Sequence, residues 1–144
     1  MRNRFAEELT KIAIENDDIV LLYGDIGNKL FDQFKVQFPG RYFNCGVAEA
    51  NMVSVAAGLA KSGFKPWVYT INSFLYLKTL EQIKLDVCYQ ELPVTLVGTG
   101  GGLSYSELGT THHSLEDLGV LSQLPALKVF APGTTSSLSE VMKY

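Results

Sequence analysis

The feature that most constrains this chain is an uninterrupted apolar run of strand length, Ile19-Val20-Leu21-Leu22-Tyr23. A strand without polar alternation is typical of a sheet that is covered on both faces, as in parallel sheets. Further strands are expected at 41–44, 64–71, 92–97 and 128–130, and helical patterns separate them. This alternation predicts an α/β fold of three layers, with a mostly parallel sheet and helices on both faces.

Apolar residues at helical spacing predict the helices that cover this sheet. They are expected at 2–15, 30–38, 49–61 and 74–89, followed by one helix after Ser114 and one after Ser137. Asn72 and Ser73 are expected to cap the helix from Phe74. The spacings Ser114–Asp117 and Ser137–Glu140 resemble capping boxes. Because the last helix reaches the final residue, we expect a chain cut at a domain edge or within a longer protein.

Composition excludes several classes of protein. The 144 residues carry a net charge of −3 and no basic run, so a nucleic-acid partner is not expected. Two cysteines form neither a disulfide framework nor a metal-ligand cluster. The N-terminus lacks an apolar core of signal length and carries acids, so we do not expect a signal peptide, and no apolar run is long enough for a membrane. We therefore expect a single domain over 1–144, in the cytoplasm.

Glu49 is the most unusual charged residue in the chain. It follows a turn of small residues and begins an apolar helix in which the next charge is Lys61. Burial disfavours a charged carboxylate, so the pKa of Glu49 is expected to rise and the group to share a proton at neutral pH. The alternative is an acid at a helix start that faces the helix dipole.

Other polar groups follow the predicted strands. Asp25, Asn72, the glycine run 98–102 and His112 all come after a strand end, as Glu49 does. Ligands of open parallel sheets bind outside the carboxyl ends of the strands. We therefore expect these groups to gather with Glu49 at one edge of the sheet.

Phosphate-binding loops, metal sites and serine nucleophiles fit these residues less well. The glycine run lacks the lysine of a P-loop and does not open a helix directly, so a phosphate cradle is disfavoured. His112 and His113 are adjacent, so their side chains diverge, and no third metal ligand is near in sequence. No serine lies in a GxSxG elbow. A flavodoxin-like phosphate binder would rest on the sheet pattern alone.

Taken together, these stretches resemble the pyrimidine-binding domain of transketolase-type thiamine diphosphate enzymes. The similarity extends over most of the chain and is greatest to the carboxyl-half subunit of split transketolases and to deoxyxylulose-phosphate synthases. It is carried by residues 46–49, 56–60, 73–74, 80–83, 92–94, 102–104, 109–112, 116–117 and 131–132.

The resemblance implies a role for several residues. Glu49 would hydrogen-bond a ring nitrogen of the cofactor's aminopyrimidine and so assist removal of the thiazolium proton. Phe74 would stack on the pyrimidine, and Asp25 would lie near the thiazolium. His112 would contact a sugar or keto-acid substrate and act in catalysis.

Four positions depart from the family pattern. Gly100 replaces a histidine that helps to bind substrate phosphate, and Leu108, beside Glu107, replaces an aspartate near the substrate hydroxyls. His113 replaces a glutamine, and Lys29 replaces a small serine. These changes suggest an altered donor or acceptor, with His113 at the substrate and Lys29 meeting its anionic group.

The family's diphosphate-binding motif, Gly-Asp-Gly followed by an asparagine, does not occur in this chain. The resemblance therefore implies half a cofactor site, without metal ligands of its own. Magnesium and the diphosphate would be held by a diphosphate-binding domain or subunit on a partner chain. The apolar helix after Glu49 would form an interface across a two-fold axis, in a homodimer or a heterotetramer. The alternative is a non-catalytic assembly or regulatory domain.

Overall fold

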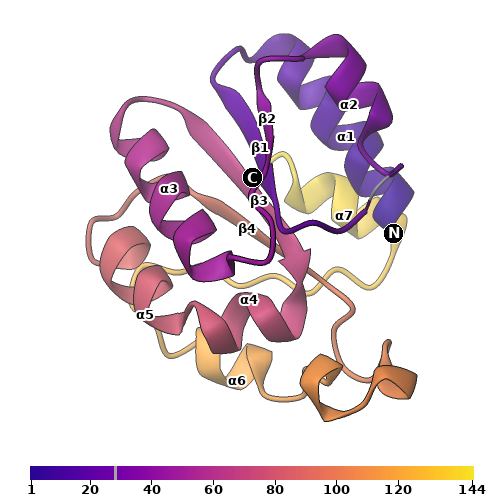
Figure 1. Cartoon of the computed structure of the whole chain (residues 1–144), viewed down its shortest axis with the longest axis vertical. Helices are drawn as coiled ribbons and strands as arrows, with labels where there is room; N and C mark the ends of the chain where they lie inside the picture. Colours follow the sequence, from indigo (N-terminus) through magenta and orange to yellow (C-terminus); the bar gives the residue numbers. More distant parts are fainter. Residues whose placement is uncertain (28) are drawn as a thin grey trace.

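The computed structural model describes residues 1–27 and 29–144, which include a four-stranded parallel sheet. The strands lie in the order β2-β1-β3-β4, and Leu22 of β1 is opposite Phe43 on one side and Val68 on the other. The predicted α/β fold is therefore confirmed, and Figure 1 shows the sheet between its helices. The strands are β1 (Ile19–Tyr23), β2 (Tyr42–Asn44), β3 (Lys65–Ile71) and β4 (Thr95–Thr99).

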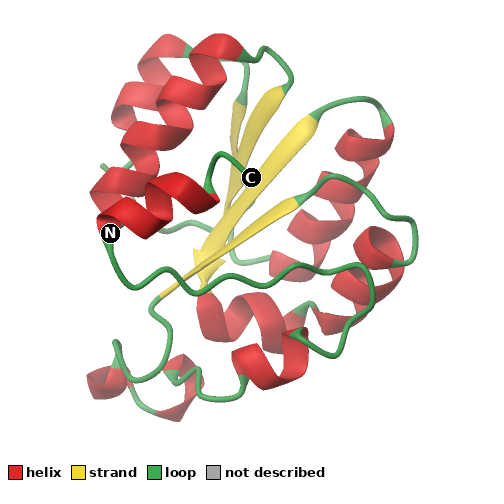
Figure 2. Ribbon diagram, turned by 180° about the vertical axis from the view of Figure 1, so that it is seen from behind, coloured by secondary structure: helices red, strands yellow, loops and turns green. Residues whose placement is uncertain are grey.

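Helices cover both faces of the sheet (Figures 1 and 2). One face carries α1 (Arg2–Glu15), α2 (Asp32–Gln37) and α7 (Thr135–Val141). The other carries α3 (Glu49–Lys61), α4 (Asn72–Lys78), α5 (Leu80–Gln82) and a π-helical turn, η1 (Ile83–Cys88). The short helix α6 (Asp117–Leu121) lies against α4, and no helix in the described residues has both the length and the apolar character to cross a bilayer.

Alternate residues of β1 supply the two halves of the core. Leu21 and Tyr23 pack with Phe5 and Leu9 of α1. Their neighbours, such as Leu22, pack with the α3 side of the molecule, so β1 is buried along its whole length. Each fully buried aliphatic side chain contributes about 1.5–3 kcal/mol, so these two layers stabilise the sheet on both of its faces.

The predicted helix over 74–89 is wrong in two respects. It begins at Asn72 after an Ile71 cap, so neither Asn72 nor Ser73 caps it. It also breaks at Thr79, whose hydroxyl donates to the Leu75 carbonyl, and resumes as α5 and η1. A β-branched residue that bonds back to the preceding turn disturbs the helical ladder, which explains the break.

The predicted strand at 128–130 is also wrong, because this segment is irregular in the structure. It lies across a cavity of about 1140 Å³ from β4. Pro125 and Pro132 flank it, each without a backbone donor, and Ala126 has a φ of 63°, which is outside the range of a strand. Pro93 similarly delays β4 until Thr95.

The two predicted caps near the C-terminus fall elsewhere. Helix α6 begins at Asp117 without a side-chain cap, since Ser114 is engaged by α4. Helix α7 begins three residues earlier than expected, with a capping box between Thr134 and Ser137. The other elements lie within two residues of their predicted ends.

Candidate functional site

The carboxyl ends of β1, β2 and β3 meet at one edge of the sheet. The Asn44 amide, at the end of β2, donates to Asp25 Oδ1 at 2.9 Å and accepts from the Gly46 N–H at 2.9 Å. Asp25 is exposed and has a φ of 48°, which an aspartate in a polar loop tolerates. This network joins the loop after β1 to the turn that leads into α3.

Glu49 lies in the first turn of α3 and is only 2% exposed. The Gly24 backbone lies beside it, since a Cβ at position 24 would be 3.7 Å from Glu49 Oε1 and 3.0 Å from Thr70 Oγ1. The Thr70 hydroxyl is itself buried and has no hydrogen-bond partner in the described residues. The sheet edge thus holds a buried carboxylate with an unsatisfied hydroxyl close by.

Lys78 forms an ion pair with Glu49 that the sequence patterns did not predict. Its Nζ lies 2.5 Å from Glu49 Oε2 and 5.2 Å from the centroid of the Phe74 ring. The Lys78 side chain is 46% exposed, whereas the carboxylate is enclosed. A signal existed in the sequence, because Lys78 follows Phe74 by four residues and so shares its helix face.

Phe74 and His112 form the outer wall of this site. Their rings meet edge to face with centroids 5.0 Å apart, and both are half-buried. His112 Nδ1 lies 3.0 Å from the Thr111 hydroxyl, and the carbonyl of Thr111 accepts from Ser73 at 2.9 Å. The structure therefore brings the predicted residues Glu49, Phe74 and His112 together around the start of α4.

Helix α4 also holds the loop beyond His112. Asn72 donates to the Ser114 hydroxyl at 2.7 Å and to the Asp117 carboxylate, while the Tyr76 hydroxyl donates to Glu116 at 2.6 Å. Burial, with the bond to Glu116, raises the pKa of Tyr76 to about 12. The same bond lowers the pKa of Glu116 below its ordinary value.

Tyr105 is a second residue that the sequence patterns did not single out. A Cβ at Gly100 would lie 2.1 Å from Tyr105 Cε2, so the ring occupies the space that a side chain at position 100 would need. The Tyr105 ring also lies near His112, with centroids 6.5 Å apart. Gly100, which departs from the family pattern, is thus matched by a local packing partner.

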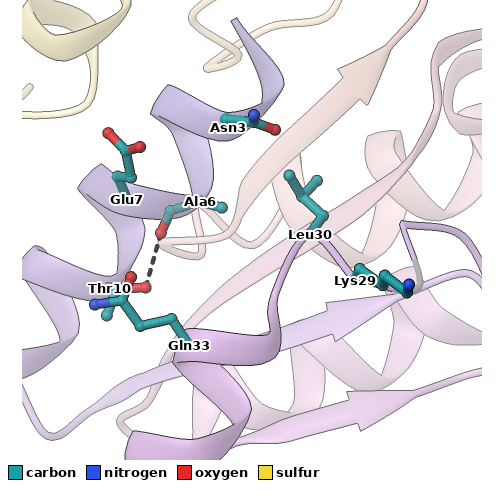
Figure 3. Close-up of a pocket in the computed structure, with 7 residues that line it drawn as sticks. All are labelled: Asn3, Ala6, Glu7, Thr10, Lys29, Leu30 and Gln33. Atoms are coloured by element: carbon teal, nitrogen blue, oxygen red, sulfur yellow. Dashed lines mark hydrogen bonds between the residues drawn. The ribbon is translucent and has the colours of Figure 1, made fainter.

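Lys29 lies apart from this cluster. It lines a hollow of about 290 Å³ between α1 and the segment before α2, and Figure 3 shows its side chain pointing away from Glu7. The described contacts include none between Lys29 and Glu49. The other residues that line the hollow are Asn3, Ala6, Glu7, Thr10, Leu30 and Gln33.

His113 contacts a different part of the loop from His112. Its Nε2 lies 3.4 Å from the Ser106 carbonyl. Within 1–27 and 29–144, no group of three histidine, cysteine, aspartate or glutamate side chains is arranged to hold a metal ion. Cys45 and Cys88 are free thiols, and burial raises the pKa of both.

Several known proteins are similar to this chain over nearly all of its length. A subunit of the apulose-4-phosphate transketolase of Phocaeicola vulgatus is 34% identical over 143 residues, which are 99% of this chain and 46% of that protein. The 6-deoxy-6-sulfo-D-fructose transketolase subunit SqwH of a Clostridium species is 34% identical over 139 residues, 96% of this chain and 43% of its own length. A 1-deoxy-D-xylulose-5-phosphate synthase of Acidobacterium capsulatum is 37% identical over 139 residues, covering 96% of this chain and 22% of the synthase.

Solved structures show the same fold. A split-gene transketolase described as an inactive β4 tetramer superposes with a TM-score of 0.86 at 31% identity, over 99% of this chain and 46% of that one. The chain thus spans less than half the length of these relatives. The family model for the transketolase pyrimidine-binding domain matches residues 1–144. The chain therefore belongs to the transketolase pyrimidine-binding domain family.

Proposed function

We propose that this chain supplies the aminopyrimidine side of a thiamine diphosphate site in a transketolase-like transferase. The observation that carries the proposal is the Glu49 carboxyl, 2% exposed, in the first turn of α3 at the carboxyl edge of a parallel sheet. A buried acid costs stability, and a buried ionisable group at the ligand-binding edge of a parallel sheet is a candidate for a functional role. The family membership says which ligand such an acid would meet.

The residues at the sheet edge fit the pyrimidine end of that cofactor. Gly24, which has no side chain, lies beside Glu49 Oε1, and the Thr70 hydroxyl, which has no partner in the described residues, lies close to the same glycine. Thiamine diphosphate, when bound, supplies the carbon nucleophile for transfer of a two-carbon ketol unit. Glu49 would hold a proton at a ring nitrogen, and Phe74 would offer its ring for stacking.

The remaining predicted residues differ in how near they lie to this pair. Asp25 would meet the thiazolium side, and His112, packed on Phe74, would contact a sugar or keto-acid substrate and act in proton transfer. His113 and Lys29 would reach substrate only if their loops move, because His113 faces the Ser106 carbonyl and Lys29 lines a separate hollow.

A partner chain would complete the site. Two relatives are named as subunits of transketolases, so we assign the diphosphate and Mg²⁺ to a diphosphate-binding domain or subunit outside this chain. The exposed side of α3 and its neighbours would meet a second copy, in a homodimer or heterotetramer. It presents Val55 at 43%, Leu77 at 62% and Leu85 at 48% exposure. The two free thiols suit a reducing, cytoplasmic setting.

The test is reconstitution with a candidate diphosphate-binding subunit, followed by calorimetric titration of thiamine diphosphate in the presence of Mg²⁺. We expect Glu49→Gln and Glu49→Ala to weaken binding about 10- to 100-fold, because a hydrogen bond to a charged group is lost. Glu81→Gln, an exposed acid on α5, is the matched control and should bind as the parent does.

A second function, a non-catalytic assembly or regulatory domain of the same fold, is favoured by one observation. Lys78 already neutralises the carboxylate that the catalytic function needs. Unchanged cofactor binding and turnover in the complex that carries Glu49→Ala would support this second function and contradict the first.

A further inference from the structure

Lys78 lies between the two side chains that would grip the aminopyrimidine. Its ammonium is 2.5 Å from Glu49 Oε2 and 5.2 Å from the Phe74 ring centroid. Figure 1 shows that α3 and α4 are neighbouring helices. Glu49 is the first residue of α3, and Phe74 and Lys78 both belong to α4. The cation therefore occupies the space beside Glu49 that faces the aromatic ring.

An ion-paired Glu49 cannot perform the role proposed for it. A carboxylate bonded to an ammonium is an acceptor only and has no proton to donate to a ring nitrogen. The ammonium and a planar ring also compete for the face of Phe74, since a cation within about 6 Å of the centroid interacts with that face. Glu49 and Phe74 are thus both engaged by one cation.

We propose that Lys78 is a displaceable occupant of the aminopyrimidine site, which holds the site closed until the ring replaces it. The inference rests on the function proposed above for Glu49. Lys78 has a way out, because its side chain is 46% exposed while Glu49 is enclosed. Once the ammonium has moved to solvent, the carboxyl can take up a proton and meet the ring nitrogen.

An occupant that must first be displaced lowers the apparent affinity of the site for the aminopyrimidine. The fraction of molecules with Lys78 away from Glu49 sets the concentration of binding-competent sites, and the apparent Kd rises as this fraction falls. If the pair is closed in nine molecules of ten, removing the ammonium should tighten binding about 10-fold. Lys78 is in this sense a positioning residue, which acts through Glu49.

The experiment titrates the full 144-residue chain with 4-amino-5-hydroxymethyl-2-methylpyrimidine, the aminopyrimidine fragment of thiamine, by NMR. The variants are Lys78→Met, which keeps the stem and removes the charge, and Lys78→Gln, which keeps an N–H donor. Lys78→Arg restores the cation, and Lys84→Met removes an exposed lysine of η1 as the matched control. Circular dichroism verifies the fold of each variant, and Lys78→Gln serves if Lys78→Met does not fold.

We expect Lys78→Met and Lys78→Gln to bind the fragment about 10-fold more tightly than the parent. Lys78→Arg and Lys84→Met should bind as the parent does. Adding Glu49→Ala to Lys78→Met should abolish the gain, because the ring then has no carboxyl to meet.

Three results would overturn the inference, and they differ in what they imply for the function proposed for Glu49. If Lys78→Met binds the fragment no more tightly than the parent while Glu49→Ala weakens binding, Lys78 is not an occupant but the function proposed for Glu49 stands. If none of these proteins binds the fragment, Lys78 is not an occupant of a site on this chain alone, and the function of Glu49 is decided by the reconstituted complex described above. If the fragment binds equally well without Glu49, both the occupant and the function of Glu49 are wrong.

Discussion

The two sides of the candidate site rest on different kinds of structure. Glu49 and Phe74 are carried by helices that pack on the sheet, where β1 and most of β3 are fully buried. His112 and Tyr105 belong to 100–144, a segment described throughout, in which only Ser114 and Met142 are buried. Few apolar contacts and a small number of side-chain hydrogen bonds hold this second side, so it is expected to open first. The side with Glu49 and Phe74, called the cofactor side, is thus held by the hydrophobic core. The side with His112 and Tyr105, called the substrate side, is held by hydrogen bonds to α4.

The largest expected effect separates the two regions by stability. Leu22→Ala should lower the free energy of unfolding by about 2–5 kcal/mol, because Leu22 is 1% exposed between the sheet and α3. Leu118→Ala, at a site 49% exposed on α6, should change it by less than about 0.5 kcal/mol. Urea denaturation measures both. Equal effects would mean that the C-terminal segment is as tightly packed as the core.

Removing the Lys78 charge should have the next largest effect on stability. Lys78→Met leaves the buried carboxylate of Glu49 without its cation, so we expect a loss of about 1–3 kcal/mol, limited by the exposure of the lysine. Thermal unfolding measures the loss, and Lys84→Met should show almost none. The double variant with Glu49→Gln should recover part of it, since the unpaired charge is gone. A larger loss in the double variant would contradict this explanation.

The substrate side can be probed with two glycines of similar backbone. Gly100 has a φ of 79° and Gly102 a φ of 64°, so alanine at either position costs about 1 kcal/mol in strain. Only at position 100 does the new Cβ strike the Tyr105 ring; at 102 it meets open space. We expect Gly100→Ala to destabilise more and to shift the NMR signals of His112, beside Tyr105. Equal shifts from Gly102→Ala would count against the packing of Tyr105 on Gly100.

A smaller and local effect is expected from Tyr76→Phe. The variant loses the 2.6 Å hydrogen bond to Glu116 but keeps the buried ring. Amide hydrogen exchange should become several-fold faster in 103–117 and remain unchanged in β1 and β3. Faster exchange throughout the sheet would show that the loop and the core open together.

The pH dependence of the hydrogen bond between Tyr76 and Glu116 follows from two pKa shifts of opposite sign. The pKa of Tyr76 is raised from 10.0 to about 12, so its contribution is complete below pH 10.0 and is lost as pH rises towards and beyond 12. The pKa of Glu116 is lowered from 4.5, so its contribution is present above 4.5 and is lost as pH falls through the lowered value. The free energy of unfolding, measured by urea denaturation at each pH, should therefore fall at both extremes. Tyr76→Phe should lose less of it at the alkaline end than the parent does.

Prediction from the sequence was accurate where local patterning and burial coincide. The strand over 19–23 and the helix over 49–61 are predicted with their correct ends. Both are buried against the core, so the spacing of their apolar residues directly reflects the type of element. The segment at 128–130 has the composition of a strand but pairs with no strand in the described residues. Composition does not indicate whether a neighbouring strand is available for pairing. The helix over 74–89 broke at Thr79 for a reason that lies in one side-chain hydrogen bond.

The amino-acid sequence is sufficient to predict the alternating fold, the family and a lone acid at the start of α3. It also predicts that Phe74 lies near the start of the helix that follows β3. It does not predict that the Lys78 ammonium contacts Glu49, 29 residues away in the chain, or that Tyr105 fills the space beside Gly100. The physical reason is that periodicity reports which face of an element is buried, whereas a pairing across helices depends on how two packed elements are aligned.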